Sequence, residues 1–192
     1  YESIALKHHT SKIDNFDDLL SVASFGFRGE ALNALCELSG SFSVSTKRAA
    51  DKIGTSLTFD RTGHLQTQKP VARSTGTTVV VERLFEVLPV RRGELLRSIK
   101  KQYSKLLKVI QAYAVISVGV KLVVTEISSK KGRNIVIATQ ANNTLMDNIS
   151  TVFGSKFVST LVPVDITITK SAKGGSLENM DKDDNEGSSG NG

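Results

Sequence analysis

The chain has 192 residues, of which 39% are hydrophobic and 23% charged, and its formal net charge is +6. These proportions are ordinary for a globular protein, and no apolar run approaches the roughly 20 residues that a membrane helix requires. Its single cysteine, Cys36, excludes an internal disulfide. The length leaves room for one large domain or two small ones, and we expect no membrane partner.

The first forty residues predict two short helices. Asn15 is a suitable N-cap for a helix that reaches Ala23, with three apolar side chains on one side. A second helix is expected from Ala31 to Leu38, before Ser39-Gly40. Its apolar face is expected to dock on a core and consists of Ala31, Leu32, Leu35 and Leu38. Cys36 is expected to be buried there as a small hydrophobe.

Two glycines, Gly26 and Gly29, precede this second helix in the run Gly26-Phe27-Arg28-Gly29-Glu30-Ala31-Leu32. Glycine lets the backbone approach a ligand without hindrance from Cβ, and the free N–H groups of a helix start attract an anion. The run therefore predicts a phosphate-binding loop. By itself a pair of glycines three residues apart is more often an ordinary turn before a core helix.

From Ser41 to Glu82 the apolar residues alternate with polar ones, which is typical of antiparallel strands. We expect strands over 54–60 and 64–69, joined by a turn at Asp60-Arg61-Thr62-Gly63. The pattern predicts a meander of about four strands, with the second helix and a following long helix over its apolar face. The fold class predicted is thus α/β, as a two-layer α+β sandwich.

Residues 91–108 are expected to form that long helix, with an apolar stripe and a basic outer face. The segment holds seven basic residues and one acid, a net charge of +6. A basic stripe suits the phosphate backbone of DNA, although a solvated face is an equally good interpretation. The candidate DNA-binding residues are Arg97, Lys100, Lys101 and Lys105.

Beyond Gly119 the pattern restarts. Strands are expected over 121–126 and 134–139 around a basic turn, Lys130-Lys131-Gly132-Arg133, then a helix from Asn143 to Gly154 and alternation over 157–169. This β-β-α-β order predicts a partial second domain, with domain bounds of 1–116 and 117–169. Residues 170–192 are rich in Gly, Ser, Asn and Asp and are expected to be a disordered tail.

Four motifs occur in a specific order: Thr10-Ser11-Lys12-Ile13, the glycine run at 26–32, Gly76-Thr77-Thr78-Val79, and Leu88-Pro89-Val90-Arg91-Arg92. Together they resemble the MutL family of DNA mismatch repair ATPases, and the match, over residues 1 to about 164, resembles the PMS-type eukaryotic subunit. The resemblance implies a GHKL-type ATPase domain whose ATP lid contains the glycine run. The second domain resembles the small βαβ transducer-like, ribosomal-protein-like module that follows it.

The resemblance also implies an ATP site. Its expected residues are Thr10, Ser11, Lys12, Gly26, Phe27, Arg28, Gly29, Glu30, Ala31, Leu32 and Thr77. For Thr77 a plain strand residue is a strong alternative, because β-branched residues favour strands. His8 and His9 are adjacent and lack the spacing of a metal site, so no metal ligand and no catalytic residue is predicted in this sequence.

The chain begins at Tyr1, inside the fold that the resemblance implies. The family's general-base glutamate, magnesium-binding asparagine and D-x-G-x-G aspartate precede the T-S-K-I motif, and no D-x-G-x-G run occurs here. We therefore expect a fragment that is inactive in hydrolysis on its own, with ATP and Mg²⁺ as cofactors of the intact protein. The enzyme assignment stays open.

The resemblance implies a nuclear mismatch repair protein that couples mismatch recognition to excision. Its expected partners are DNA, a second MutL-type subunit as heterodimer partner, and mismatch-recognition proteins of the MutS type. Two alternatives remain at this point. One is a non-catalytic module that binds DNA or dimerises; the other is a different GHKL ATPase such as a topoisomerase subunit, against which the Leu88–Arg92 motif argues.

Overall fold

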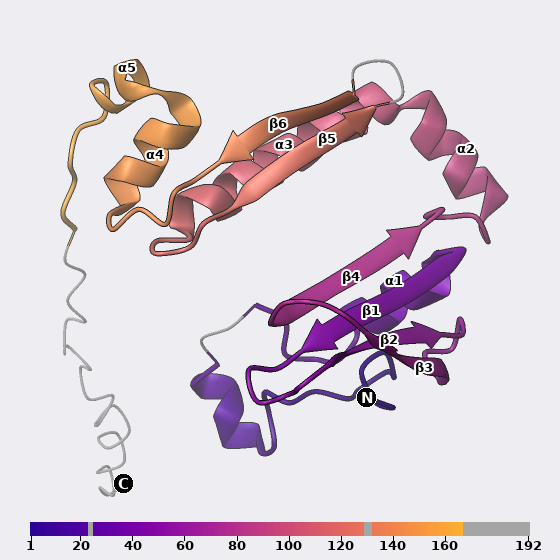
Figure 1. Cartoon of the computed structure of the whole chain (residues 1–192). Helices are drawn as coiled ribbons and strands as arrows, with labels where there is room; N and C mark the ends of the chain where they lie inside the picture. Colours follow the sequence, from indigo (N-terminus) through magenta and orange to yellow (C-terminus); the bar gives the residue numbers. More distant parts are fainter. Residues whose placement is uncertain (23–24, 129–131, 167–192) are drawn as a thin grey trace, which may run out of the picture. The chain divides into compact units, whose positions relative to one another are not determined.

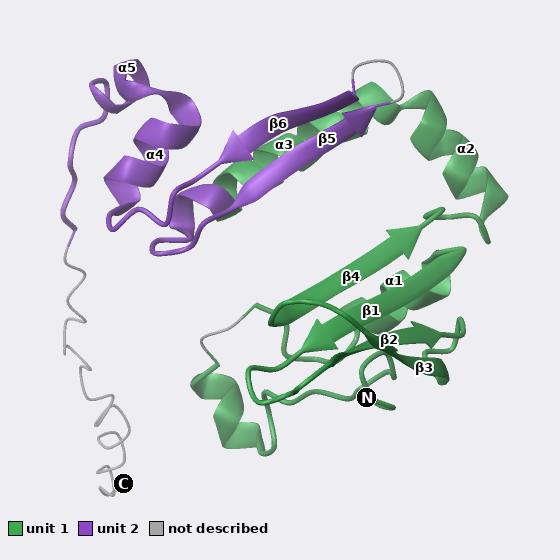
Figure 2. Ribbon diagram, in the orientation of Figure 1, with its two compact units in different colours: residues 1–113 green, residues 114–192 purple. Residues whose placement is uncertain are grey.

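The computed structural model of the chain describes residues 1–22, 25–128 and 132–166. It contains two compact units, residues 1–113 and residues 114–192 (Figures 1 and 2). The tail predicted from residue 170 and the turn residues Lys130 and Lys131 lie outside the described residues. Within the described ranges, no helix combines the length and the apolar character needed to cross a membrane.

Unit 1 is built on a four-stranded antiparallel sheet. Its strands are β1 (Ser41–Lys47), β2 (Gly54–Phe59), β3 (Leu65–Val71) and β4 (Gly76–Glu82), in the spatial order β3-β2-β1-β4. The predicted strands and the Asp60–Gly63 turn are confirmed, with the Gly63 N–H donating to the carbonyl of Asp60 at 3.1 Å.

The predicted meander is wrong in one connection, because β4 pairs with β1 and not with β3. The register explains this pairing: Val79 lies opposite Val44, and Val81 lies opposite Phe42. The valines of β4 thereby join the apolar face of β1. The polar strand β3, which contains Pro70, is left at the edge, where a residue without an N–H is tolerated.

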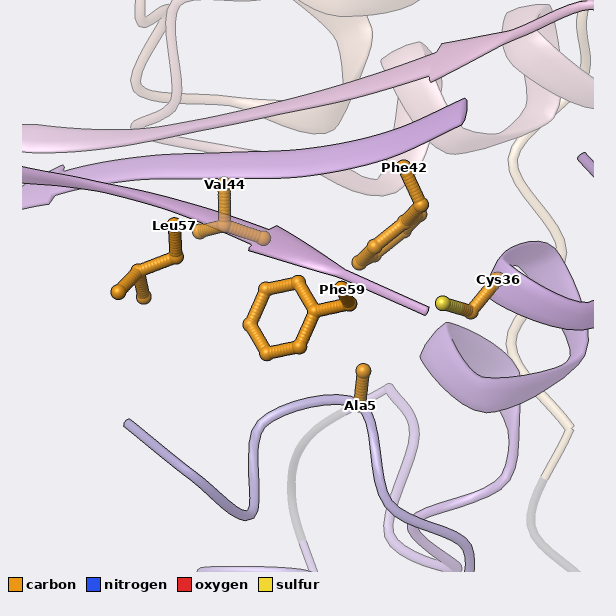
Figure 3. Close-up of a cluster of buried hydrophobic side chains, with 6 residues drawn as sticks. All are labelled: Ala5, Cys36, Phe42, Val44, Leu57 and Phe59. Atoms are coloured by element: carbon orange, nitrogen blue, oxygen red, sulfur yellow. The ribbon is translucent and has the colours of Figure 1, made fainter. Parts of the chain in front are cut away.

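The core of unit 1 lies on one face of this sheet (Figure 3). Its buried members are Ala5, Cys36, Phe42, Val44, Leu57 and Phe59. The rings of Phe42 and Phe59 meet edge to face, with their centroids 5.8 Å apart, a favourable arrangement for aromatic pairs. The alternation seen in the sequence thus sets which face of β1 and of β2 is buried.

Helix α1 (Ala31–Leu38) has the predicted bounds, but its buried face differs from the predicted one. The residues that are buried are Asn33 and Cys36, with Leu35 packed beside them, whereas Leu32 is exposed. The Asn33 amide donates to the carbonyls of Ala5 (2.8 Å) and Thr62 (3.3 Å). It therefore joins three segments that are remote in sequence.

Cys36 and Asp60 complete this junction. The Cys36 thiol donates to the Asp60 carbonyl at 2.9 Å, and burial raises the pKa of the thiol, so it stays protonated as predicted for a structural cysteine. The Asp60 carboxylate accepts hydrogen bonds from the Thr62 hydroxyl and from the Thr62 and His64 N–H groups. These bonds hold the pKa of Asp60 below its ordinary value, with the Thr62 hydroxyl as the largest cause.

The other helices of unit 1 differ from the predictions. The segment after Asn15 is a short 3₁₀ helix, η1 (Phe16–Leu20), and its Phe16 and Leu20 are exposed. Residues 91–108 do not form one helix but belong to α2 (Pro89–Arg97) and α3 (Ile99–Ile116). The break is at Ser98, whose backbone leaves the helical region and whose hydroxyl donates to the Glu94 carbonyl at 2.8 Å.

The apolar stripe of α3 does not form the expected cover over the sheet. Leu106 is 52% exposed and Val109 is 54% exposed, and in α3 the buried residue is Ala114. The 3.6-residue spacing of apolar residues therefore predicts the helix correctly. It does not predict which part of the protein packs against the apolar stripe.

Unit 2 contains the hairpin of β5 (Val123–Ser128) and β6 (Gly132–Ala138), then α4 (Leu145–Phe153) and α5 (Ser155–Val158). The predicted helix is confirmed and ends at Gly154, with Thr144 as its N-cap. The strand expected over 157–169 is wrong for its described part. Residues 157 and 158 belong to α5, and residues 161–166 have no regular structure.

Unit 2 also relies on buried polar side chains. Asn148 on α4 is fully buried, and its amide donates to the carbonyl of Val115 while its oxygen accepts from Asn142, both at 3.1 Å. The Thr139 hydroxyl donates to the Val120 carbonyl and accepts from the Leu122 N–H. These bonds attach α4 and the segment before β5 to the rest of the unit.

We expect Asn33→Ala to destabilise unit 1 by about 1–3 kcal/mol, because two backbone carbonyls lose their buried donor. The free energy of unfolding, measured by urea denaturation, checks this. Glu37→Ala, at an exposed position of the same helix, is the control and should change stability by less than about 0.5 kcal/mol. Equal effects of the two substitutions would contradict the role given to Asn33.

Candidate nucleotide site

A cavity of about 1010 Å³ lies in unit 1 between the segment before η1 and the loop that leads into α1. The structure places ten of the eleven expected ATP-binding residues on its lining. They are Thr10, Ser11, Lys12, Gly26, Phe27, Arg28, Gly29, Glu30, Ala31 and Leu32. Two motifs that are far apart in sequence therefore form one concave surface, which opens at the start of α1.

Gly29 holds the two segments together. The His8 N–H donates to the Gly29 carbonyl at 3.0 Å, and Gly29 has a φ of 63°. A Cβ at this position would collide with the backbone of His9. Gly26 also has a positive φ, 75°, but a Cβ there would meet open space. The second glycine is thus required by a close approach of two backbone segments, and the first by its φ alone.

The charges on the lining are arranged around Glu30. Its carboxylate lies 3.6 Å from Nδ1 of His8 and 3.9 Å from Nε of Arg28. All three side chains are partly or largely exposed, so these pairs contribute little to stability. Their effect on a ligand is larger, because the glutamate offsets part of the positive potential that Arg28 and Lys12 bring to the cavity.

Thr77 is the expected ATP-binding residue that is not on the lining of this cavity. It lies in β4, opposite Thr46 of β1, and the two hydroxyl oxygens are 2.8 Å apart. Its contacts in the described structure are those of a strand residue.

His8 and His9 line the cavity although the sequence motifs did not assign them to the site. His8 has a φ of 64°, and the ring of His9 is hydrogen-bonded through Nδ1 to the Lys7 carbonyl at 2.9 Å. Their position directly before the T-S-K-I motif was the available signal. The residue types themselves gave no such signal, because two adjacent histidines do not indicate a particular ligand.

An aromatic contact joins the cavity to α3. The ring of Phe25 meets the ring of Tyr113 edge to face, with a centroid distance of 5.1 Å. Phe25 also lines the cavity. A residue at the start of the glycine loop is therefore in contact with the helix that carries most of the expected DNA-binding residues.

The expected DNA-binding residues lie around a second hollow, of about 670 Å³, where α2 meets α3. Arg97, Lys101 and Lys105 line this hollow, whereas Lys100 does not. As for metals, the described residues include no group of three or more His, Cys, Asp or Glu side chains arranged to hold an ion.

We expect Gly29→Ala to destabilise unit 1 more than Gly26→Ala. Both substitutions force alanine into a positive φ at a cost of about 1–2 kcal/mol, but only the first adds a clash with the His9 backbone. The midpoints of urea unfolding of the two variants test this. A Gly26 variant that is as unstable as the Gly29 variant would contradict the close approach described here.

The chain is similar to several curated mismatch repair proteins. It is 44% identical over 173 residues to DNA mismatch repair protein PMS1 of Arabidopsis thaliana, which covers 90% of the chain. It is 45% identical over 163 residues to mismatch repair endonuclease PMS2 of Homo sapiens and of Mus musculus, which covers 85% of the chain. The chain spans about a fifth, 19%, of the length of each of these relatives. No family model matches the chain.

Two solved structures share the fold. One is described as the crystal structure of the N-terminal domain of a DNA repair protein, with a TM-score of 0.67, 39% identity, and coverage of 81% of this chain and 43% of that one. The other is the Aquifex aeolicus MutL ATPase domain complexed with ADP, with a TM-score of 0.53, 25% identity, and coverage of 73% and 52%. The topoisomerase alternative is therefore set aside, and the chain belongs to the PMS-type eukaryotic MutL homologues of DNA mismatch repair, matching part of their N-terminal ATPase-domain region.

Proposed function

We propose that the cavity at the start of α1 is the phosphate side of an ATP site, and that the glycine run at 26–32 is its lid. The observation that carries this proposal is the joint lining of one cavity by the T-S-K segment and the glycine run. ADP bound to the Aquifex aeolicus MutL ATPase domain, a structural relative, supports the choice of an adenine nucleotide.

Each group has a role in this proposal. The backbone amides around Gly26 and at the start of α1 donate to phosphate oxygens, aided by the helix dipole. Arg28 and Lys12 supply positive charge, and the hydroxyls of Thr10 and Ser11 supply further hydrogen bonds. Glu30 lies 3.9 Å from Arg28 and would give up this pairing when the arginine binds a phosphate. Thr77 remains a proposed contact from the neighbouring strand.

Hydrolysis is proposed for the intact protein and not for this segment. We propose that the Mg²⁺ that accompanies ATP is held in the intact protein by the asparagine that the family places before the T-S-K-I motif. When bound, Mg²⁺ neutralises phosphate charge. The residues of this chain bind the phosphates and exclude water from them.

We further propose that the segment contributes to DNA binding. Residues 91–108 carry a net charge of +6, equal to that of the whole chain, and they lie on two consecutive helices of unit 1. Binding through a phosphate backbone requires such a surface and no reading of bases. A non-catalytic DNA-binding role is the second candidate, and the same surface favours it.

For the intact protein we propose the setting that its family suggests. It pairs with a second MutL-type subunit, works with MutS-type mismatch-recognition proteins in the nucleus, and couples mismatch recognition to excision. In that setting residues 1–116 are the later part of a GHKL-type ATPase domain, and residues 117–169 are the beginning of a βαβ-type second domain.

We expect Arg28→Ala to weaken ATP binding about tenfold, because one charge-assisted hydrogen bond to phosphate is removed. The measurement is a titration with a fluorescent ATP analogue, with and without Mg²⁺, on this chain and on a version extended towards the N-terminus. Arg61→Ala, in the β2–β3 turn and away from the cavity lining, is the control. Equal affinities of the two variants would contradict the assignment of the cavity.

We expect simultaneous replacement of Arg97, Lys100, Lys101 and Lys105 by alanine to reduce the salt dependence of DNA binding. Each cation that no longer meets a phosphate lowers the slope of log K against log[salt] by about 0.9, so the full set lowers it by up to about 3.6. Fluorescence anisotropy with a duplex oligonucleotide at several salt concentrations measures the slope. The control variant replaces Lys52 and Arg61 by alanine. An unchanged salt slope in the quadruple variant would refute the proposal that this surface binds DNA.

A further inference from the structure

The hollow at the α2–α3 junction, called the pocket below, is open to solvent and is lined mainly by charged and polar side chains. It has a volume of about 670 Å³, and its lining comes from α2, from α3 and from the loop before α2. Four of the lining residues are cations, Arg91, Arg97, Lys101 and Lys105, and one is an acid, Glu94. Arg91 is thus brought together with lysines that lie ten to fourteen positions later in the chain.

Helix geometry explains this gathering. Arg91 and Glu94 are three residues apart on one face of α2, and Lys101 and Lys105 are four residues apart on one face of α3. The break at Ser98 separates the two helices, so the two faces bound one concavity. Phe85, in the loop before α2, supplies an apolar wall and is half-buried.

In the described ranges, none of Arg91, Arg97, Lys101 and Lys105 forms an ion pair. By contrast, Arg48 pairs with Asp51 and Arg83 pairs with Glu86, each at 2.9 Å. Like charges held around a hollow repel each other and concentrate positive potential there, which favours an anion.

The other polar groups suit a phosphate as well. Ser98 and Gln102 line the pocket, and the Gln102 amide lies 3.4 Å from the Ser98 hydroxyl, a weak bond that a stronger acceptor can replace. Two arginines offer paired N–H groups with the spacing of phosphate oxygens. The single acid, Glu94, lowers the net charge of the lining to +3, so the pocket is matched to one or two phosphate groups.

We propose that this pocket seats a backbone phosphate group of DNA and so fixes the position of the duplex on the α2–α3 surface. The inference rests on the DNA binding proposed above and makes it more specific. If the basic surface binds DNA diffusely, each cation contributes to the affinity according to its distance from the duplex. A seated phosphate instead requires Arg91, which is not among the candidate DNA-binding residues predicted from the sequence, and depends less on equal charges that lie outside the pocket.

Two double variants separate these possibilities. Arg91→Ala with Lys105→Ala removes one arginine of α2 and one lysine of α3 from the pocket. Arg92→Ala with Lys108→Ala removes the same charges from the same helices at positions that do not line it. Affinity for a duplex oligonucleotide is measured by anisotropy over a range of salt concentrations, after circular dichroism and thermal melting show that each variant is folded. If the pocket pair does not fold, Arg91→Gln with Lys105→Gln replaces it.

We expect the pocket pair to weaken binding by about tenfold or more and to lower the salt slope by about 1.8, and the outside pair to weaken binding several times less. Equal weakening by both pairs would overturn the pocket and leave the proposed DNA binding intact. Absence of duplex binding by the unsubstituted chain would overturn the proposed DNA binding itself. Inorganic phosphate that displaces DNA better than sulfate at equal ionic strength, and does so only with Arg91 and Lys105 present, would assign the pocket to free phosphate instead.

Discussion

The hydrogen bonds of one buried amide, that of Asn33, are the constraint on which unit 1 depends. By donating to the Ala5 and Thr62 carbonyls, Asn33 fixes the start of the chain and the β2–β3 turn to α1. The cavity before α1 is lined by Ser3 and Ile4, which precede Ala5, and by residues of α1, so its shape depends on the same junction. Asn148 plays the equivalent part in unit 2, where it joins α4 to Val115. In both units a small apolar core is thus supplemented by a buried amide that only one arrangement of segments satisfies.

The strands of the unit 1 sheet, the Asp60–Gly63 turn and the bounds of α1 could be predicted from the sequence because they follow from local periods and turn chemistry. The order of the strands could not, since the pairing of β4 with β1 is a matter of matching valines to Phe42 and Val44 across more than thirty residues. The buried face of α1 was misjudged for a related reason. Asn33 is polar, and its burial is explained only by two acceptors that the sequence does not place near it.

In the candidate site, too, some features could be predicted from the sequence and others depend on contacts between remote segments. The glycine run and the T-S-K segment were predicted as one site through a resemblance, and the structure places them around one cavity. The participation of His8 was not predicted, since it depends on a positive φ and on the carbonyl of Gly29. The break at Ser98 was missed because the apolar period continues through it, and that break is what turns a basic stripe into a pocket.

The position of β4 in the sheet has a consequence for handling the chain. β3, at one edge, contains Pro70 and the charged Lys69, features that discourage pairing with another molecule. β4, at the other edge, has no proline, and its Val79 and Val80 are both 42% exposed. Among the described residues, no strand pairs with β4 on its outer side. An unpaired strand edge with exposed valines favours pairing between molecules, so a further charged residue on β4, in addition to Glu82, is expected to keep preparations of this segment soluble.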